Sequence, residues 1–139
     1  MDIITPSLAP VAVEADLDVV LLRCTDQLHF DPTPLCRLFA EKDSVEAEEQ
    51  LCRILEDIAM RLDMLQQNMS RCTFDRMLKP ARRIGTIADQ IGLTEVAISA
   101  GHVVACLKQA DGIALAATMA RLERAFDVAV SEVWNFRDT

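Results

Sequence analysis

Apolar residues recur at alternating steps of three and four along four long segments of the chain. This spacing is typical of an α-helix that buries one face, because 3.6 residues complete one turn. The first segment opens at Ser44, an expected N-cap, and the second runs from about residue 73 to residue 91. The third begins at Thr94, a second expected N-cap, and ends where Asp111 and Gly112 turn the chain. The fourth continues from there toward the C-terminus.

Only short turns separate these segments, so neighbouring helices are expected to run antiparallel. The pattern predicts an all-α fold, an antiparallel up-down four-helix bundle over residues 44–139. The positions expected to face inward are Leu51, Leu55, Ile58, Leu62, Leu65 and Met69 in the first segment, Phe74, Met77, Ala81, Ile84, Ala88 and Ile91 in the second, Val96, Ala100, Val103, Leu107 and Ala110 in the third, and Leu115, Met119, Leu122, Phe126, Ala129, Val133 and Phe136 in the fourth.

Residues 1–43 form an N-terminal extension with a different pattern, which four prolines interrupt. A short helix is expected from Pro34 to Glu41, because proline is well placed in the first turn of a helix. Its apolar residues Leu35, Leu38 and Phe39 would face inward. We expect this short capping helix, with the rest of the extension, to cover one end or one groove of the bundle.

Pro80 falls inside the second segment, where a proline removes a backbone hydrogen bond and strains the preceding turn by about 3 kcal/mol. Either the helix kinks at this residue or it starts late. A kink would shape the surface around Lys79, Arg82 and Arg83, or the bundle would simply absorb it.

The composition is that of one globular domain and excludes several classes of function. Of 139 residues, 51% are apolar and 26% are charged, which rules out a disordered or low-complexity chain. The net charge of −8 would repel nucleic acid and anionic membranes, and the absence of tyrosine argues against a base-stacking surface. We therefore expect neither nucleic acid nor a membrane as partner.

Cysteine and histidine usage indicates a cytoplasmic protein without a metal or other cofactor. The five cysteines form no C-x-x-C pair, and the two histidines stand apart from any second ligand. Neither a signal peptide nor a membrane span is recognisable, and no Gly-rich phosphate loop occurs. Cys52, Cys72 and Cys106 are expected as small buried side chains, and four of the methionines, at positions 60, 64, 69 and 77, as core or boundary residues.

Two stretches carry a resemblance to a known family. The first is Ala81-Arg82-Arg83-Ile84-Gly85-Thr86-Ile87-Ala88-Asp89-Gln90-Ile91-Gly92-Leu93, and the second is Ala110-Asp111-Gly112 followed by Met119-Ala120-Arg121-Leu122-Glu123-Arg124-Ala125-Phe126. They resemble the Ala-His-x-Leu-Lys-Gly-x-Ala-x-x-x-Gly-Ala segment and the acidic-glycine turn with final helix of histidine-containing phosphotransfer (Hpt) domains. The resemblance covers residues 51–133 and implies a four-helix bundle that meets receiver domains or sensor kinases of bacterial phosphorelays.

The chain departs from this pattern at the residue that carries the chemistry. Arg82 stands at the position of the phosphorylated histidine, and Gly85 and Thr86 stand where the family has lysine and glycine. A guanidinium stays protonated and has no free lone pair with which to attack phosphorus. The resemblance therefore implies a non-catalytic module that binds its partner, with no enzymatic activity, and the low surface at Gly85 and Thr86 would still admit a receiver domain.

An uneven distribution of charge supports one candidate binding face. Residues 71–83 hold five basic residues and one acidic residue, whereas residues 41–57 hold seven acidic and two basic residues. The candidate partner-binding face consists of Lys79, Arg82, Arg83, Gly85 and Thr86. The alternative interpretation is a solvated face whose cations pair with the carboxylates of the first helix.

Two other functions stay open from the sequence. His102 is expected at the height of Arg82 on the neighbouring helix, which makes an active phosphotransfer protein with a relocated acceptor one alternative. The other is a homodimeric helical scaffold unrelated to phosphorelays, in which an uncovered apolar face forms a symmetric interface.

Overall fold

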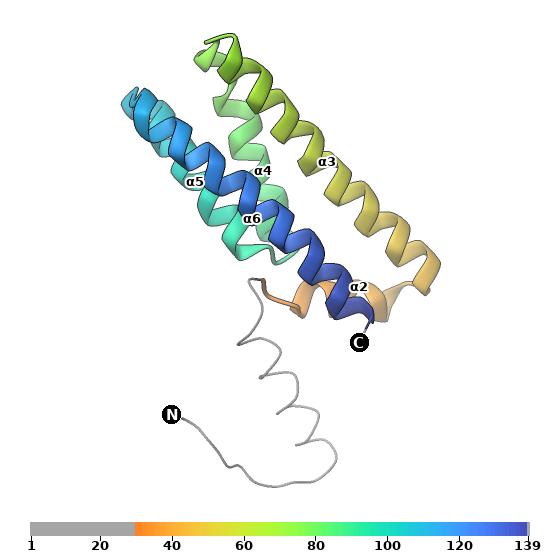
Figure 1. The fold of residues 1–139 in the computed structure, drawn as a ribbon. Helices are drawn as coiled ribbons and strands as arrows, with labels where there is room; N and C mark the ends of the chain where they lie inside the picture. The colour runs from red at the N-terminus through yellow and green to blue at the C-terminus, as the bar shows by residue number, and fades with distance from the viewer. Residues whose placement is uncertain (1–29, 139) are drawn as a thin grey trace, which may run out of the picture.

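The computed structural model describes residues 30–138, and every regular element in this part of the chain is a helix. The elements, numbered as in Figure 1, are α2 (Thr33–Glu41), α3 (Ser44–Ser70), the short 3₁₀ helix η1 (Phe74–Arg76), α4 (Leu78–Gln90), α5 (Thr94–Gln109) and α6 (Gly112–Asp138). The all-α prediction is confirmed for these residues. Expectations for residues 1–29 lie outside the described residues.

The four long helices, α3 to α6, lie side by side, and each runs opposite to the one before it (Figure 1). They share one hydrophobic core. Helices α3 and α6 are joined by a hydrogen bond of 2.6 Å from Gln66 Nε2 to Glu123 Oε2 and by an ion pair of 2.6 Å between Arg137 and Glu48. This arrangement is compatible with the predicted up-down four-helix bundle.

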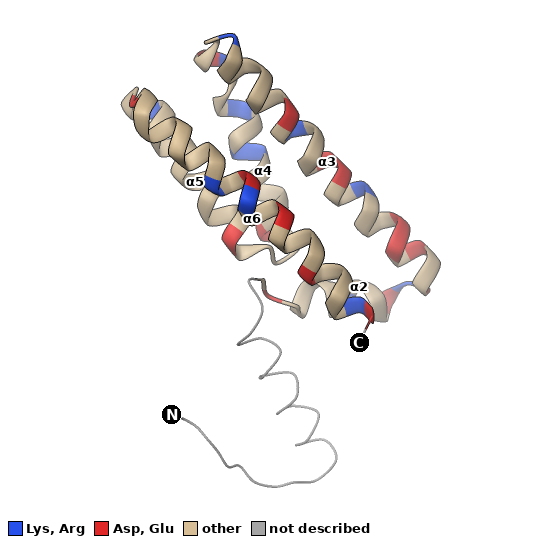
Figure 2. Cartoon of the chain, viewed as in Figure 1, with Lys and Arg blue, Asp and Glu red and all other residues tan. Residues whose placement is uncertain are grey.

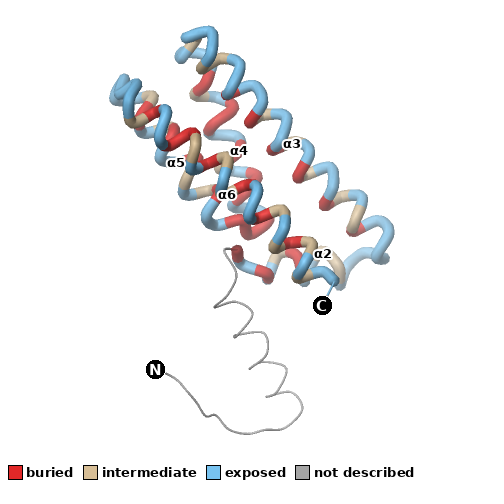
Figure 3. The backbone as a smooth tube through the Cα atoms, in the orientation of Figure 1, coloured by how far each residue is buried: buried red, intermediate tan, exposed pale blue. Residues whose placement is uncertain are grey.

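Burial follows the predicted stripes along the inner side of each long helix (Figure 3). The clear exceptions lie at helix ends, where Phe74 is 43% exposed and Ala110 is also exposed. In α5, Cys106 is buried, whereas the predicted Leu107 is only half-buried. Phe74 is exposed because η1 and a separate start of α4 replace the continuous helix expected from residue 73.

Three helix starts differ in detail from the prediction. Asp43, and not Ser44, caps α3, because its Oδ1 accepts a hydrogen bond of 2.9 Å from the backbone N–H of Glu46. Leu93, and not Thr94, is the N-cap of α5, and no side chain caps that helix. Pro80 lies in the first turn of α4, where a backbone N–H has no partner within the helix in any case. Of the two possibilities predicted for Pro80, a kinked helix or a late start, the structure therefore has the late start of α4.

The turn between α4 and α5 is built on Gly92, which ends the helix as predicted. Its φ of +85° is left-handed, and the backbone N–H of Leu93 donates to the carbonyl oxygen of Ala88 over 2.8 Å. At the end of α5 the left-handed residue is Ala110, with a φ of 55°, directly before Asp111 and Gly112, where a turn was predicted. The side chain of Asp111 then accepts a hydrogen bond from the backbone N–H of Ala114 and caps α6.

Helix α2 packs near the start of α3 and the end of α6, which is compatible with the predicted capping helix. Leu35 is buried, and Leu38 and Phe39 are half-buried. The rings of Phe30 and Phe136 meet edge to face, with centroids 5.8 Å apart. Residues 30–41 therefore belong to the same core as the long helices.

Several sulfur-containing side chains are less buried than predicted. Cys106 is buried, but Cys52 and Cys72 are exposed, so the prediction was wrong for both. Met77 lies in the core, whereas Met60 is 53% exposed. Cys52 and Met60 lie on the outer face of α3, away from the stripe that packs on α4, where no other described helix covers them.

Candidate functional site

The candidate face lies on α4, whose exposed side carries three basic residues. Lys79, Arg82 and Arg83 are exposed, while the opposite side of the same helix buries Ala81 and Ile84. Steps of three and four place the three cations on adjacent positions of one helical face. Arg71 and Arg76 precede α4 in the C-cap of α3 and in η1, so the basic stretch spans three elements and not one helix.

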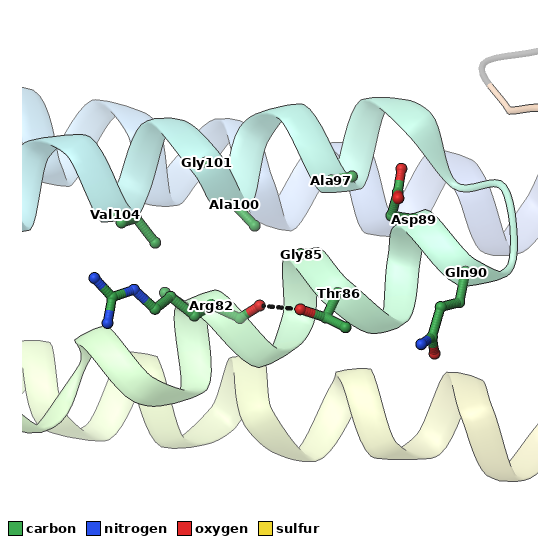
Figure 4. A pocket seen from close by; sticks show the side chains of 10 residues that line it. Arg82, Gly85, Thr86, Asp89, Gln90, Ala97, Ala100, Gly101 and Val104 are labelled. Carbon is green, nitrogen blue, oxygen red and sulfur yellow. Dashed lines mark hydrogen bonds between the residues drawn. The ribbon is translucent and has the colours of Figure 1, made fainter.

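A groove of about 510 Å³ runs between α4 and α5 (Figure 4). Gly85 is half-buried, and a Cβ added to it would lie 3.7 Å from Ala100 Cβ. The two helices therefore approach closely at this point because small residues meet there. The residues that line the groove are Ala81, Arg82, Gly85, Thr86, Asp89 and Gln90 from α4, and Ala97, Ala100, Gly101 and Val104 from α5.

The two ends of the groove carry charges of opposite sign. Arg82 extends toward Val104 at one end, and Asp89 lies at the other end with Gln90 (Figure 4). Between them the Thr86 hydroxyl donates a hydrogen bond of 3.2 Å to the backbone carbonyl of Arg82. This bond turns the hydroxyl toward its own helix. Of the described residues that line the groove, Arg82 alone carries a positive charge.

The cations of α4 are not paired with carboxylates of α3 in the part of the chain that the structure describes. Among residues 30–138, the ion pairs join Arg61 to Asp57 and Arg137 to Glu48 and Asp138. In Figure 2 the blue segments of α4 lie in its first half, whereas red segments occur along much of α3. The interpretation of an internally paired face is therefore wrong for the described carboxylates.

The structure brings some of the predicted site residues together and separates others. Arg82, Gly85 and Thr86 line the groove, whereas Lys79 and Arg83 lie on the outer face of α4 beside it. His102 is exposed on α5 and is not among the residues that line the groove. The groove thus presents a guanidinium, a carboxylate, a primary amide and a hydroxyl, but no imidazole.

The wall contributed by α5 was missed by the sequence reasoning. Ala97, Ala100, Gly101 and Val104 form it, and their small size at spacings of three and four was visible in the sequence. Their role became clear only from the register between α4 and α5, which places Ala100 opposite Gly85.

Two smaller hollows lie where α2 meets the long helices. One, of about 320 Å³, is lined by residues of α2, α3 and α4 that include Arg37, Glu41 and Ile87. The other, of about 200 Å³, is mostly apolar and lies beside Phe39 and Phe136. Neither adjoins the cations of α4.

Comparisons with protein-family models, with curated proteins and with solved structures find no match for this chain. Within residues 30–138, no helix combines the length and apolar character that crossing a membrane requires. Nor are three side chains of His, Cys, Asp or Glu grouped in these residues so that they would hold a metal ion. The groove and the charges beside it are therefore the features from which a function is inferred.

Proposed function

We propose that the chain is a cytoplasmic, Hpt-like four-helix bundle that binds a partner of two-component signalling without carrying phosphate itself. The partner is a receiver domain or a histidine kinase. It docks on the face formed by Lys79, Arg82, Arg83, Gly85 and Thr86. The chain is not an enzyme under this proposal, and it uses no cofactor.

The observation that carries the proposal is the open groove with an unneutralised cationic rim. Arg82 lines the groove, Lys79 and Arg83 are exposed beside it, and no described carboxylate pairs with any of the three. The protein as a whole is nevertheless acidic, with a net charge of −8. A basic face on an acidic protein favours an acidic partner and orients it as it approaches.

The chemistry of the groove favours binding of a partner over phosphoryl transfer. A phosphoacceptor needs a neutral nitrogen with a free lone pair, and the guanidinium of Arg82 has none. The same guanidinium donates parallel hydrogen bonds to carboxylates and phosphates. Gly85 lines the groove and adds no side chain to it, so a partner surface can come near the backbone of α4.

The proposal is tested by binding measurements with purified receiver domains and histidine kinases of the organism that encodes the chain. The unmodified protein should bind at least one of them, and affinity should fall as salt rises above about 0.15 M, where the screening length is about 8 Å. Lys79→Glu with Arg83→Glu should abolish this binding. Helix content and melting temperature should stay close to those of the parent, because both side chains are exposed.

A matched control reverses two exposed arginines elsewhere on the surface. Arg53→Glu with Arg121→Glu makes the same change in net charge on α3 and α6, away from the groove. This control should bind as the parent does. Equal loss in both double variants, or no binding to any receiver or kinase, would contradict the proposal.

The alternative with His102 as acceptor is separated by the same proteins. Incubation with a phosphorylated receiver would then leave acid-labile phosphate on the chain, which the proposed function excludes. The alternative of a homodimeric scaffold unrelated to phosphorelays is separated by the binding measurement, because it predicts no affinity for receivers or kinases.

A further inference from the structure

Helix α5 carries an exposed stripe that no described part of the chain covers. The stripe lies opposite the buried residues Val96, Ala100 and Val103. Between its two charged ends it contains no Asp, Glu, Lys or Arg, although the protein as a whole is 26% charged. Its members, all exposed, are Glu95, Ile98, Gly101, His102, Ala105 and Lys108.

Gly101 lines the edge of the groove between α4 and α5, but packing among the described residues does not require a glycine at this position. Within residues 30–138, a Cβ at this position would meet no atom within 4 Å, and the φ of Gly101 is not left-handed. A glycine inside an exposed helix costs about 1 kcal/mol relative to alanine. Ile98, one turn away, is 53% exposed. A second helix lying on this stripe would bury Ile98 and would use the missing side chain of Gly101 for close approach.

The stripe is complementary to a second copy of itself that runs in the opposite direction. Glu95 lies six residues before Gly101, and Lys108 lies six residues after His102. Ile98 lies three residues before Gly101, and Ala105 lies three residues after His102. A two-fold axis at the midpoint between Gly101 and His102 therefore brings each Glu95 to the level of the Lys108 in another copy, and each Ile98 to the level of an Ala105.

We propose that α5 is the seam of a symmetric, antiparallel homodimer of this chain. Opposite charges then meet at both ends of the seam, a large apolar side chain meets a small one on each side of the centre, and Gly101 lies at the dyad. An isologous interface of this kind requires self-complementarity, which the stripe has. Two copies that each carry a net charge of −8 repel one another, so an uncharged strip with complementary ends is where they can approach.

The electrostatics of the isolated helix explain only part of this pattern. Glu95 in the first turn and Lys108 in the last turn both suit the helix dipole. The dipole explains neither the exposed Ile98 nor the glycine at the centre. Exchanging the charges of Glu95 and Lys108 separates the two explanations. The helix dipole predicts a less stable α5, whereas the proposed seam predicts that the exchanged protein still dimerises.

The association state is measured by sedimentation velocity over a range of protein concentrations. The parent should form a reversible dimer. Glu95→Lys or Lys108→Glu alone should raise the dissociation constant by about tenfold or more, because two opposite-charge pairs become two like-charge pairs. Glu56→Lys and Arg53→Glu, exposed on α3, make the same changes in charge away from the seam and should leave the dissociation constant close to that of the parent.

Mixing the two single variants is the sharpest part of the test. In a heterodimer of Glu95→Lys with Lys108→Glu, both ends of the seam again join opposite charges, so the mixture should associate although neither variant does alone. The double variant Glu95→Lys with Lys108→Glu should also dimerise, although both charges then oppose the dipole of α5. Recovery of the dimer in that variant cannot come from a more stable helix.

Gly101→Leu tests the centre of the seam independently of charge. A Cβ at position 101 meets no atom of residues 30–138 within 4 Å, so circular dichroism should show a folded protein, while the dimer should be lost. A parent that stays monomeric up to about 1 mM, where binding free energy is only about 4 kcal/mol, would overturn the proposal. A dimer that is unaffected by Gly101→Leu, or equally affected by the α3 controls, would overturn it as well.

Discussion

The backbone N–H of Asp31 donates a hydrogen bond of 2.6 Å to the carbonyl oxygen of Gly92, which ties the chain before α2 to the turn between α4 and α5. A Cβ on Gly92 would collide with the carbonyl oxygen of Asp31. The same turn sets the register of the two helices that form the groove. The absence of a side chain at Gly92 is therefore required both by its own φ and by this close approach.

Gly92→Ala should lower the free energy of unfolding by about 2–3 kcal/mol. A left-handed alanine costs about 1–2 kcal/mol, and moving the Asp31 carbonyl away weakens a backbone hydrogen bond worth about 1 kcal/mol. Chemical denaturation measures the loss. Gly112→Ala is the control, since its Cβ meets nothing within 4 Å and its φ is not left-handed. Similar losses of unfolding free energy for both substitutions would show that the contact between Gly92 and Asp31 does not contribute to stability.

Ala110→Gly should raise the free energy of unfolding by about 0.5–1 kcal/mol. Ala110 has a φ of 55° and a ψ of 38° at the C-terminal end of α5, a conformation that glycine adopts without steric cost. The same change at Ala117, an exposed position inside α6, should lower stability by about 1 kcal/mol. Opposite signs for one chemical change would confirm that the left-handed backbone is the cause, and a loss at both sites would contradict it.

The helices and their inner faces were predictable because each long segment buries a single stripe with helical spacing. Leu51, Ile58 and Leu122, all predicted to face inward, are fully buried. Helix ends were harder, because a cap depends on which of two adjacent polar residues reaches a backbone N–H. At the start of α3 both Asp43 and Ser44 are suitable residue types, and only the geometry selects Asp43.

The candidate site was predictable only on the side that lies in one continuous stretch of sequence. Arg82, Gly85 and Thr86 are close in sequence, and their spacing placed them together on α4. The wall from α5 depends on how far that helix is displaced along α4, which no local pattern encodes. That no described carboxylate pairs with Arg82 depends on where the carboxylates of α3 project, and this too is a property of packing between helices.

The Asp43 cap should make the stability of α3 depend on acid pH. The hydrogen bond from the backbone N–H of Glu46 lowers the pKa of the Asp43 carboxyl below its ordinary value of 3.8. Because the folded state favours the carboxylate, the cap stabilises the protein above that value and loses this effect as the pH falls through the lowered pKa.

This pH dependence is measured best where Glu46 no longer titrates, since the hydrogen bond to Asp43 raises the pKa of Glu46. In a Glu46→Gln background, thermal denaturation is compared with and without Asp43→Asn. The protein with Asp43 should be more stable at pH 7, and the difference should shrink toward pH 3. A difference that stays constant from pH 7 to pH 3 would show that the charge of Asp43 contributes nothing to the cap.

The unmodified chain should accept no phosphoryl group from a phosphorylated receiver domain. In such a transfer a nitrogen lone pair attacks phosphorus while the acyl phosphate bond breaks and the receiver carboxylate leaves, and Arg82 offers no such lone pair. Arg82→His with Gly85→Lys and Thr86→Gly supplies an imidazole and a cation beside the groove, and this triple variant should take up acid-labile phosphate if the docking face is intact. Replacing the new imidazole, with Arg82→Ala in the same background, is the matched control and should remain unlabelled. Labelling of the unmodified chain that disappears in His102→Ala would instead place the acceptor on α5 and contradict a purely binding role for the groove.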